Sequence, residues 1–401
     1  MRIPFKLHFR SVLILLAVFL MGGTLPLSAK RDSLQFSLLT CAPGDLVYEL
    51  FGHTAIRGRN LTTGEDWVYN YGVFDFGAPN FIMRFVRGET DYQLGVVPYY
   101  FFEREYRLRG SAVTEQVLAL RPQEARRLDS LLRNNYLPEN RVYRYNYFYD
   151  NCTTRARDRI EEALDGVVTY APMQEEGTFR QWVSRCTQDS PWTDFGIGLC
   201  LGAEADRPIS ARSQMFLPAN LMEAFSGATV GDGRRLVGAE REIIPSNRQG
   251  GEGSSVLPPM LVGLLLLAVV LVCSVVEWRR RKVWWGIDLL LFALQGLGGC
   301  VIAFLFFFSV HPTVGSNYLL VLFNPLPLIC LPWMIIRARK GQKCLYDVAN
   351  VVILTLFIAF FPLIPQKISL VVVSLALNLL IRSVLHLAVA RARVQLLLNF
   401  K

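Results

Sequence analysis

Two side chains between residues 30 and 257 have the types that nucleophilic catalysis requires. Cys152 stands in the run Asp-Asn-Cys-Thr-Thr, where a strand-like stretch gives way to a helix, and His53 is the single histidine of this region. A thiolate is the nucleophilic form of cysteine, and a helix N-terminus lowers the pKa of a thiol. An imidazole can take the thiol proton and later return it. The pair therefore predicts chemistry at an acyl carbon, with Cys152 as nucleophile and His53 as base.

A third polar group has to orient the imidazole, and Asn70 is the candidate. Residues 53–57 and 67–71 alternate as strands do, and a hairpin centred near residues 61–62 puts Asn70 about opposite His53. A Cys-His-Asn set is a known catalytic arrangement. The same asparagine can equally be a plain hydrogen-bonding residue of a strand.

Neighbours of these residues are expected to support the site. Asn151 and Thr153 flank Cys152 at the start of the helix, and Tyr71 follows the candidate orienting residue. The free N–H groups of a helix start can also bind an oxyanion. The structural alternative is an inert buried thiol and a structural histidine, but Gly52 allows close backbone approach beside the imidazole, which favours a site.

The cysteines give no sign of a metal centre. The chain has neither a Cys-x-x-Cys pair nor a zinc-type spacing, so we expect no metal and no organic cofactor. Cys186 and Cys200 can pair in an oxidising compartment, and two separate buried thiols are the equal alternative.

The elements around the candidate pair mix strands and helices. Residues 34–100 are expected to be mainly β, and residues 111–120 form a further strand-like run. A proline start and spaced leucines predict a helix over 122–134, and a second helix is predicted over 153–165. Together these elements predict an α+β domain over residues 30–225.

The rest of the chain is too apolar for a soluble domain. Hydrophobic residues make up 52% of the 401, which favours a membrane protein. After a linker rich in Gly, Ser and charge over 226–257, the part 258–401 holds five apolar stretches, each able to cross a hydrocarbon core of about 30 Å. They lie at about residues 258–277, 285–309, 317–336, 346–364 and 368–388. We therefore predict a transmembrane domain of five helices.

Charge predicts the topology. A basic start and an apolar run over 11–27 predict a signal peptide over 1–29, with an uncleaved anchor as the alternative. Basic residues gather in the loops after the first and third apolar stretches and at the C-terminal end, where Arg382 is counted. The positive-inside rule then puts residues 30–257 outside the cytoplasm and the C-terminus inside.

The net charge of +9 follows from this topology. Of the 42 Lys and Arg residues 26 lie in 30–257, and of the 33 Asp and Glu residues 30 do. The exported region is therefore mildly acidic, and no nucleic-acid partner is expected.

Three polar residues at the membrane part are secondary candidates. His311, Asn317 and Asn324 lie on the exported side of the apolar stretches or inside them. Polar groups at such depth are costly unless they line a cavity, so they are candidates for lining a lipid site. Capping and kinking of helices is the alternative.

Three short motifs resemble a known superfamily. They are Phe51-Gly52-His53-Thr-Ala-Ile-Arg57, Tyr69-Asn70-Tyr71-Gly72 and Asp150-Asn151-Cys152-Thr-Thr-Arg155. In this order they resemble the circularly permuted branch of the NlpC-type papain-like proteins. The pair Asn151-Cys152 is similar to that of lecithin:retinol acyltransferase-type (LRAT-like) enzymes. With the membrane tail, nearly the whole chain resembles the Lnb-type lipoprotein N-acyltransferases of bacteria.

The resemblance implies a fold and a reaction. The fold is a permuted papain-like (NlpC/LRAT-like) α+β domain in the periplasm, followed by an all-α domain of five helices in the inner membrane of a Gram-negative bacterium. The reaction moves an acyl chain from a membrane phospholipid, through a thioester on Cys152, to the N-terminal amine of a diacylated lipoprotein. A cell-envelope cysteine peptidase or amidase with the same Cys-His pair is the alternative, and a non-catalytic scaffold is a third.

Overall fold

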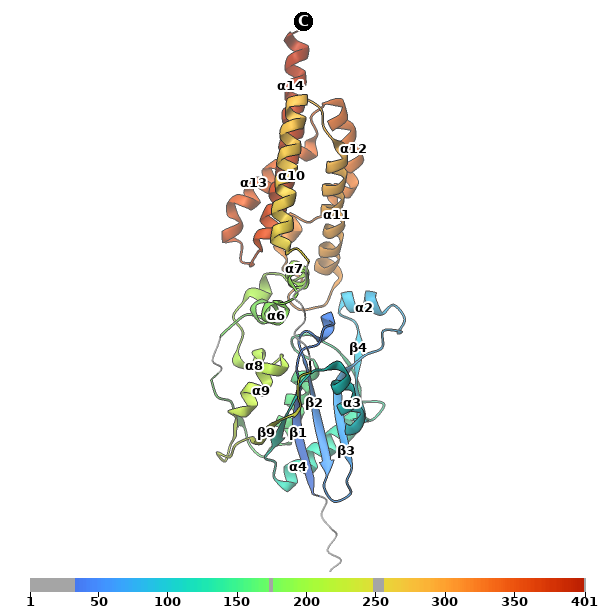
Figure 1. Ribbon diagram of the computed structural model, residues 1–401, viewed down its shortest axis with the longest axis vertical. Helices are drawn as coiled ribbons and strands as arrows, with labels where there is room; N and C mark the ends of the chain where they lie inside the picture. Colours follow the sequence, from blue (N-terminus) through green and yellow to red (C-terminus); the bar gives the residue numbers. More distant parts are fainter. Residues whose placement is uncertain (1–32, 173–175, 248–255, 400–401) are drawn as a thin grey trace, which may run out of the picture.

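The computed structural model describes residues 33–172, 176–247 and 256–399. Figure 1 shows two parts stacked along the long axis, a domain of strands and helices below and a bundle of long helices above. This arrangement confirms the predicted α+β domain followed by an all-α domain. The signal peptide predicted over 1–29 lies outside the described residues.

A seven-stranded sheet forms the centre of the lower domain. Its strand order is β6-β4-β3-β2-β1-β5-β9, and all neighbouring strands pair antiparallel. His53 is the first residue of β2, near the middle of the sheet. The strands are β1 (Leu34–Cys41), β2 (His53–Asn60), β3 (Asp66–Val73), β4 (Asp91–Pro98), β5 (Val113–Leu118), β6 (Val142–Arg144) and β9 (Val237–Ile244).

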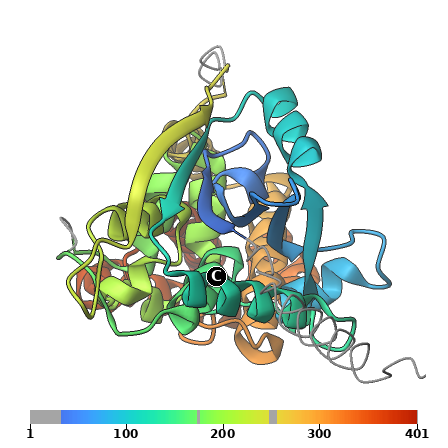
Figure 2. The same cartoon turned by 90° about the horizontal axis from the view of Figure 1, so that it is seen from below.

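Helices cover both faces of this sheet (Figure 2). On one face Leu128, Leu132 and Ile160 are fully buried against the strands. Each such side chain stabilises the domain by about 1.5–3 kcal/mol, so this layer holds the helix that starts with Cys152 firmly on β2 and β3. The helices on this face are α4 (Pro122–Tyr136), α5 (Cys152–Ala163) and α9 (Pro218–Ser226), and α3 (Tyr99–Arg109) covers the other face.

Residues 226–257 were predicted to form a linker, and this prediction is wrong for much of the part of this range that the structure describes. Residues Thr229–Val230 form β8, which pairs with β7 (Val168–Thr169), and β9 joins the main sheet beside β5. Val237 and Ile244 are buried at the two ends of β9, whereas residues 238–242 are exposed. A polar, exposed edge strand lacks the alternation that marks a half-buried strand, so its composition resembled that of a loop.

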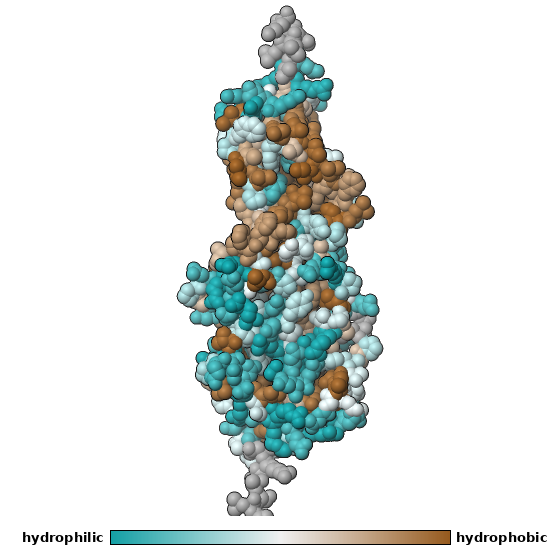
Figure 3. Space-filling model, turned by 180° about the vertical axis from the view of Figure 1, so that it is seen from behind, coloured by the Kyte–Doolittle hydropathy of each residue, from teal (hydrophilic) through white to brown (hydrophobic). Residues whose placement is uncertain are grey.

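The upper part contains five helices that are long and apolar enough to cross a membrane, as predicted. Figure 3 shows the hydrophobic surface of this part above the more hydrophilic lower domain. The third span is broken near Asn324 because Pro325 and Pro327 have no N–H to continue a helix. The elements are α10 (Pro259–Arg280), α11 (Trp285–Phe308), η3 (Tyr318–Val321), α12 (Leu326–Lys340), α13 (Leu345–Phe360), η4 (Phe361–Leu363) and α14 (Leu370–Asn399).

A buried cluster of charges joins these helices. Arg382 of α14 is fully buried and bonds Glu277 of α10 and Asp288 of α11, each at 2.6 Å. His386 lies 3.1 Å from both Asp288 and Asp347 of α13. Arg382, counted among the cytoplasmic charges from sequence, is therefore an internal residue of the bundle.

Backbone and amide hydrogen bonds tie the lower domain to the loops of the bundle. Gly202 donates its N–H to the carbonyl of Thr313 at 2.6 Å. The Asn317 amide donates to the carbonyl of Leu199 at 2.7 Å, and the Gln366 amide to that of Leu201 at 3.0 Å. Leu199 lies at the end of α7 (Pro191–Cys200), which also contacts α10 and α11. The two parts thus share an ordered junction.

Candidate active site

Cys152 is the first residue of α5, and Asn151 is the residue that caps this helix. The Asn151 side-chain oxygen accepts the N–H groups of Thr153 and Thr154, each at 2.9 Å. Its amide nitrogen donates to the carbonyls of Tyr147 and Phe216 at 2.8 and 2.9 Å. All four bonding positions of the amide are engaged, so Asn151 fixes the helix start and has no group left for a substrate.

The thiol of Cys152 and the imidazole of His53 interact directly, by a side-chain hydrogen bond and by charge. Burial would raise the pKa of the Cys152 thiol, but the charge and hydrogen bond of His53, with the N–H of Thr54, lower it to about 7. Burial would lower the pKa of His53, but Cys152 and Asn70 raise it. Each partner thus favours the charged form of the other, as in an activated thiolate–imidazolium pair.

Asn70 reaches His53, although the predicted register is wrong by two residues. Its side-chain oxygen lies 3.2 Å from His53 Nε2. In the hairpin, Ile56 pairs with Tyr69, a register that sets Gly72 at the level of His53. Asn70 is therefore a diagonal neighbour, still within side-chain reach. With Nε2–H donated to Asn70, Nδ1 is the nitrogen left to accept the thiol proton.

Replacing Asn70 with alanine should lower turnover by roughly 10- to 100-fold, less than loss of the thiol or the imidazole, because an orienting residue forms no bond to substrate. Single-turnover kinetics of Asn70→Ala would measure this, with Asn247→Ala, an exposed residue after β9, as the control. Unchanged kinetics in Asn70→Ala would show that another group orients His53.

The Thr153 hydroxyl lies beside the Cys152 sulfur, whereas the Tyr71 hydroxyl bonds elsewhere. The Thr153 hydroxyl lies 3.7 Å from Cys152 Sγ and 3.1 Å from the Thr54 hydroxyl. Tyr71 is buried in the core and donates its hydroxyl to Asn135 at 2.7 Å. The expected support from Tyr71 is therefore limited to packing.

Tyr145 is a site residue that the sequence did not reveal. It lines the same cavity as Cys152 and stacks on Tyr92 with ring centres 4.1 Å apart. Burial, and then the nearby charge of Cys152, raise the pKa of Tyr145 well above its ordinary value. Its hydroxyl therefore stays protonated and can donate a hydrogen bond. The only signal in the sequence was the tyrosine-rich run before the cysteine.

Cys152, His53 and Asn70 open into a cavity of about 1170 Å³. The lining is mostly aromatic and aliphatic and comes from both parts of the molecule, including the loop 311–314 after α11. Of the three membrane-side candidates, His311 lines this cavity. Asn317 and Asn324 are outside the lining: Asn317 caps η3 by accepting the N–H of Leu319, and Asn324 accepts the N–H of Leu326, the first residue of α12.

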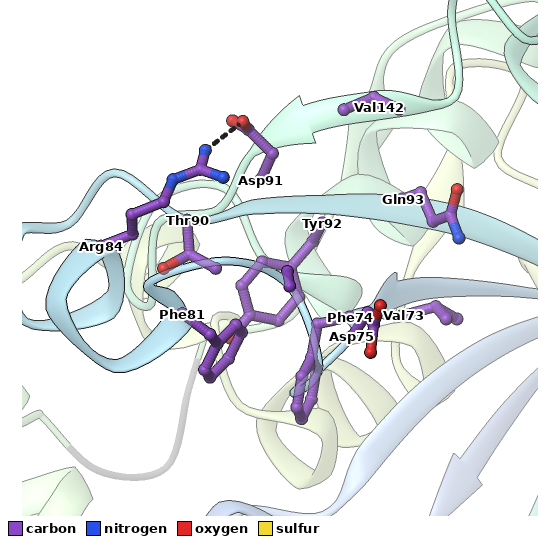
Figure 4. Close-up of a pocket in the computed structure, with 11 residues that line it drawn as sticks. Val73, Phe74, Asp75, Phe81, Arg84, Thr90, Asp91, Tyr92, Gln93 and Val142 are labelled. Carbon is purple, nitrogen blue, oxygen red and sulfur yellow. Dashed lines mark hydrogen bonds and ion pairs between the residues drawn. The ribbon is translucent and has the colours of Figure 1, made fainter.

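A smaller pocket of about 160 Å³ shares lining residues with this cavity, and Figure 4 shows the residues around the small pocket. The aromatic rings of Phe74, Phe81 and Tyr92 belong to the walls of both. The ion pair of Arg84 and Asp91, at 2.6 Å, lies at its edge. Neither cysteine nor histidine is among the described residues that line the small pocket, and its shared rings extend the apolar wall of the large cavity.

The other exported cysteines are unlike Cys152. Burial raises the pKa of the Cys186 thiol to about 11 and also raises the pKa values of Cys41 and Cys200. Cys186 and Cys200 are free thiols, so the disulfide alternative is not formed in this structure. Within the described residues no group of three or more His, Cys, Asp or Glu side chains is arranged to hold a metal ion.

Two family models match the chain. Residues 27–185 match the Lnb N-terminal periplasmic domain, and residues 251–393 match the Lnb transmembrane domain. The first match contains Cys152, His53 and Asn70, and the second contains all five candidate spans. Searches of curated proteins and of solved structures gave no significant match.

Proposed function

The chain belongs to the Lnb family, as a membrane protein of the lipoprotein N-acyltransferase type with a periplasmic N-terminal domain, and from this premise we propose that it is a thiol acyltransferase. Cys152 takes an acyl chain from a membrane phospholipid and passes it to the amine of a diacylated lipoprotein. The order of the His strand and the Cys helix supports a permuted papain-like site. The basic loops of the bundle support an inner-membrane protein with a cytoplasmic C-terminus.

The first half of the reaction forms a thioester. His53 Nδ1 takes the thiol proton, and Cys152 Sγ attacks the ester carbonyl of the phospholipid. The backbone N–H of Cys152 has no acceptor among the described residues, and with the Tyr145 hydroxyl it supports binding of the oxyanion. The C–O bond then breaks, and the lysophospholipid oxygen leaves with the proton held by His53.

The second half transfers the acyl group. The amine of the diacylglyceryl-cysteine attacks the thioester carbonyl, and His53 accepts the amine proton. The C–S bond breaks, the proton returns to the sulfur, and a triacylated lipoprotein and the free thiol result. Asn70 holds the imidazole in one orientation through both halves.

The observation that carries this proposal is the apolar cavity into which the activated thiol opens. A volume of about 1170 Å³ and a lining of Phe, Tyr, Val and Leu side chains suit an acyl chain better than a polar peptide. The cavity also borders the loop after α11, at the end of a membrane span. A peptidase would need neither feature.

The charges of the lining are consistent with an anionic lipid. Two arginines line the cavity. Arg109 is paired with Glu49 at 2.8 Å and with Glu105 at 2.5 Å. Arg141 has no ion pair within the part of the chain that the structure describes, so its guanidinium is free to bind a phosphate group.

Enzyme in detergent, given phospholipid but no acceptor, should accumulate an acyl thioester on Cys152, because the second half of the reaction cannot proceed. Intact-mass spectrometry would detect the acyl group, and neutral hydroxylamine should remove it. Adding a diacylated lipopeptide should yield triacylated product and lysophospholipid. Cleavage of peptidoglycan fragments, with no acyl group ever on Cys152, would instead establish the peptidase alternative.

A further inference from the structure

Large apolar side chains lie exposed around one end of the lower domain. They belong to η1 (Val47–Glu49), to the loop after β3 and to α2 (Phe81–Arg87). Aromatic contacts join these segments, since the Tyr48 and Phe76 rings are 6.0 Å apart and the Phe76 and Phe81 rings 5.0 Å. The exposed side chains, here called the apolar rim, are Val47, Tyr48, Phe76, Ile82, Met83 and Phe85.

The apolar rim is fixed to the end of a membrane span. The backbone N–H of Val310 donates to the carbonyl of Arg87 at 2.9 Å, and the Ser309 hydroxyl to that of Val86 at 2.8 Å. The His311 ring contacts the carbonyl of Phe85 at 2.7 Å. These three residues directly follow α11, whose last residue is Phe308. Helix α2 therefore lies beside the end of the candidate membrane span α11 (Figure 1).

Charges of α2 agree with a position at the lipid headgroups. Arg84 pairs with Asp91 at 2.6 Å, and Arg87 pairs with Glu89 at 2.8 Å. Met83 is about half exposed on the same helix, and Ile82 is 77% exposed. A helix with exposed apolar side chains and arginines held beside them is typical of a segment that lies in a membrane interface.

The apolar rim is also the border of the catalytic cavity. Val47, Tyr48, Phe76, Ile82 and Phe85 line the cavity that contains Cys152, whereas Met83 points outside the lining. The rim, next to the end of the membrane span, and the thiol thus belong to the lining of one cavity, in which apolar side chains predominate. A lipid tail can follow such a surface without being transferred into water.

We propose that the apolar rim is immersed in the periplasmic leaflet and that the acyl donor slides sideways from the bilayer into the cavity. The occupant of the rim is bilayer lipid. The identity of the donor rests on the proposed function, but the contact of the rim with lipid does not depend on any activity.

Lipid contact is tested directly by photocrosslinking. A benzophenone side chain would replace Met83 or, as the control, Val167, which is 79% exposed beyond the far end of α5 from Cys152. The proteins would be placed in nanodiscs of phosphatidylethanolamine and phosphatidylglycerol and irradiated. Phospholipid adducts at position 83 and none at 167 are expected. No adduct at 83, or equal adducts at both positions, would overturn the proposal.

The sideways route is tested with Met83→Asp, which puts a charge into the rim but not into the cavity lining. Acyl transfer from phospholipid in bilayers should fall about tenfold or more, while transfer from a short-chain phospholipid dissolved as monomers should be unchanged. Val167→Asp should match wild type in both assays. An equal loss in both assays would refute the sideways route, whereas an inactive wild type would count against the proposed function and leave the crosslinking result standing.

Discussion

Cys152→Ser is expected to lower acyl transfer by roughly a thousandfold or more, with the protein still folded and inserted. A serine hydroxyl is almost un-ionised near neutral pH, whereas His53 holds the pKa of the Cys152 thiol at about 7. The substitution changes one atom, and the cap of α5 by Asn151 does not depend on it. Transfer of a labelled acyl chain to a diacylated lipopeptide would measure the loss.

The matched control is Cys186→Ser, a thiol of the same domain whose pKa is raised to about 11 by burial. It should retain activity near that of wild type. Alkylation by iodoacetamide gives a second measurement, because the rate at Cys152 should rise with pH through about 7 as the thiol loses its proton. In His53→Ala the rise should move to higher pH, since burial is then no longer opposed by the imidazolium charge. Undiminished turnover of Cys152→Ser would transfer the nucleophile's role to another residue.

The catalytic candidates could be found from sequence because each carries a local signal. Cys152 follows an asparagine that caps a helix, and the apolar spacing after it marks that helix. His53 needed no pattern at all, since no other histidine lies between residues 30 and 257. The five spans were equally accessible, because a long apolar run is itself the physical requirement for crossing a bilayer.

The register of the hairpin formed by β2 and β3, and the place of Tyr145 in the site, could not be predicted in this way. The Asn60 side chain accepts the N–H groups of Thr62 and Thr63, which widens the turn and shifts the hairpin by two residues. Four tyrosines alternate over 143–149, and which of them faces the sulfur depends on the path of the chain after β6. That path places Tyr145 in the cavity and buries Tyr143 in the core. Both outcomes rest on contacts between distant segments.

In the membrane part, the burial of Arg382 could not be predicted from sequence for the same reason. Near a cytoplasmic end, an arginine counts toward the positive-inside rule whether it faces water or not. Its partners Glu277 and Asp288 are 105 and 94 residues away. Only three acidic residues lie outside 30–257, namely these two and Asp347, and all three belong to the buried cluster. The three acidic residues of the membrane part are therefore a better signal of the buried cluster than Arg382 itself, since each carboxylate needs a partner inside a membrane bundle.

Arg382→Met is expected to lower the free energy of unfolding by roughly 3–5 kcal/mol, because it leaves Glu277 buried without a cation and leaves Asp288 with His386 alone. Unfolding in mixed micelles would measure this change.

Arg391→Met, an exposed position on the same helix, is the control and should change stability little. In a triple variant, Glu277→Gln and Asp288→Asn are added to Arg382→Met. This variant should recover much of the lost stability, because positions 277 and 288 then carry no negative charge that lacks its arginine. A large loss that the added amides do not recover would mean that Arg382 acts through packing.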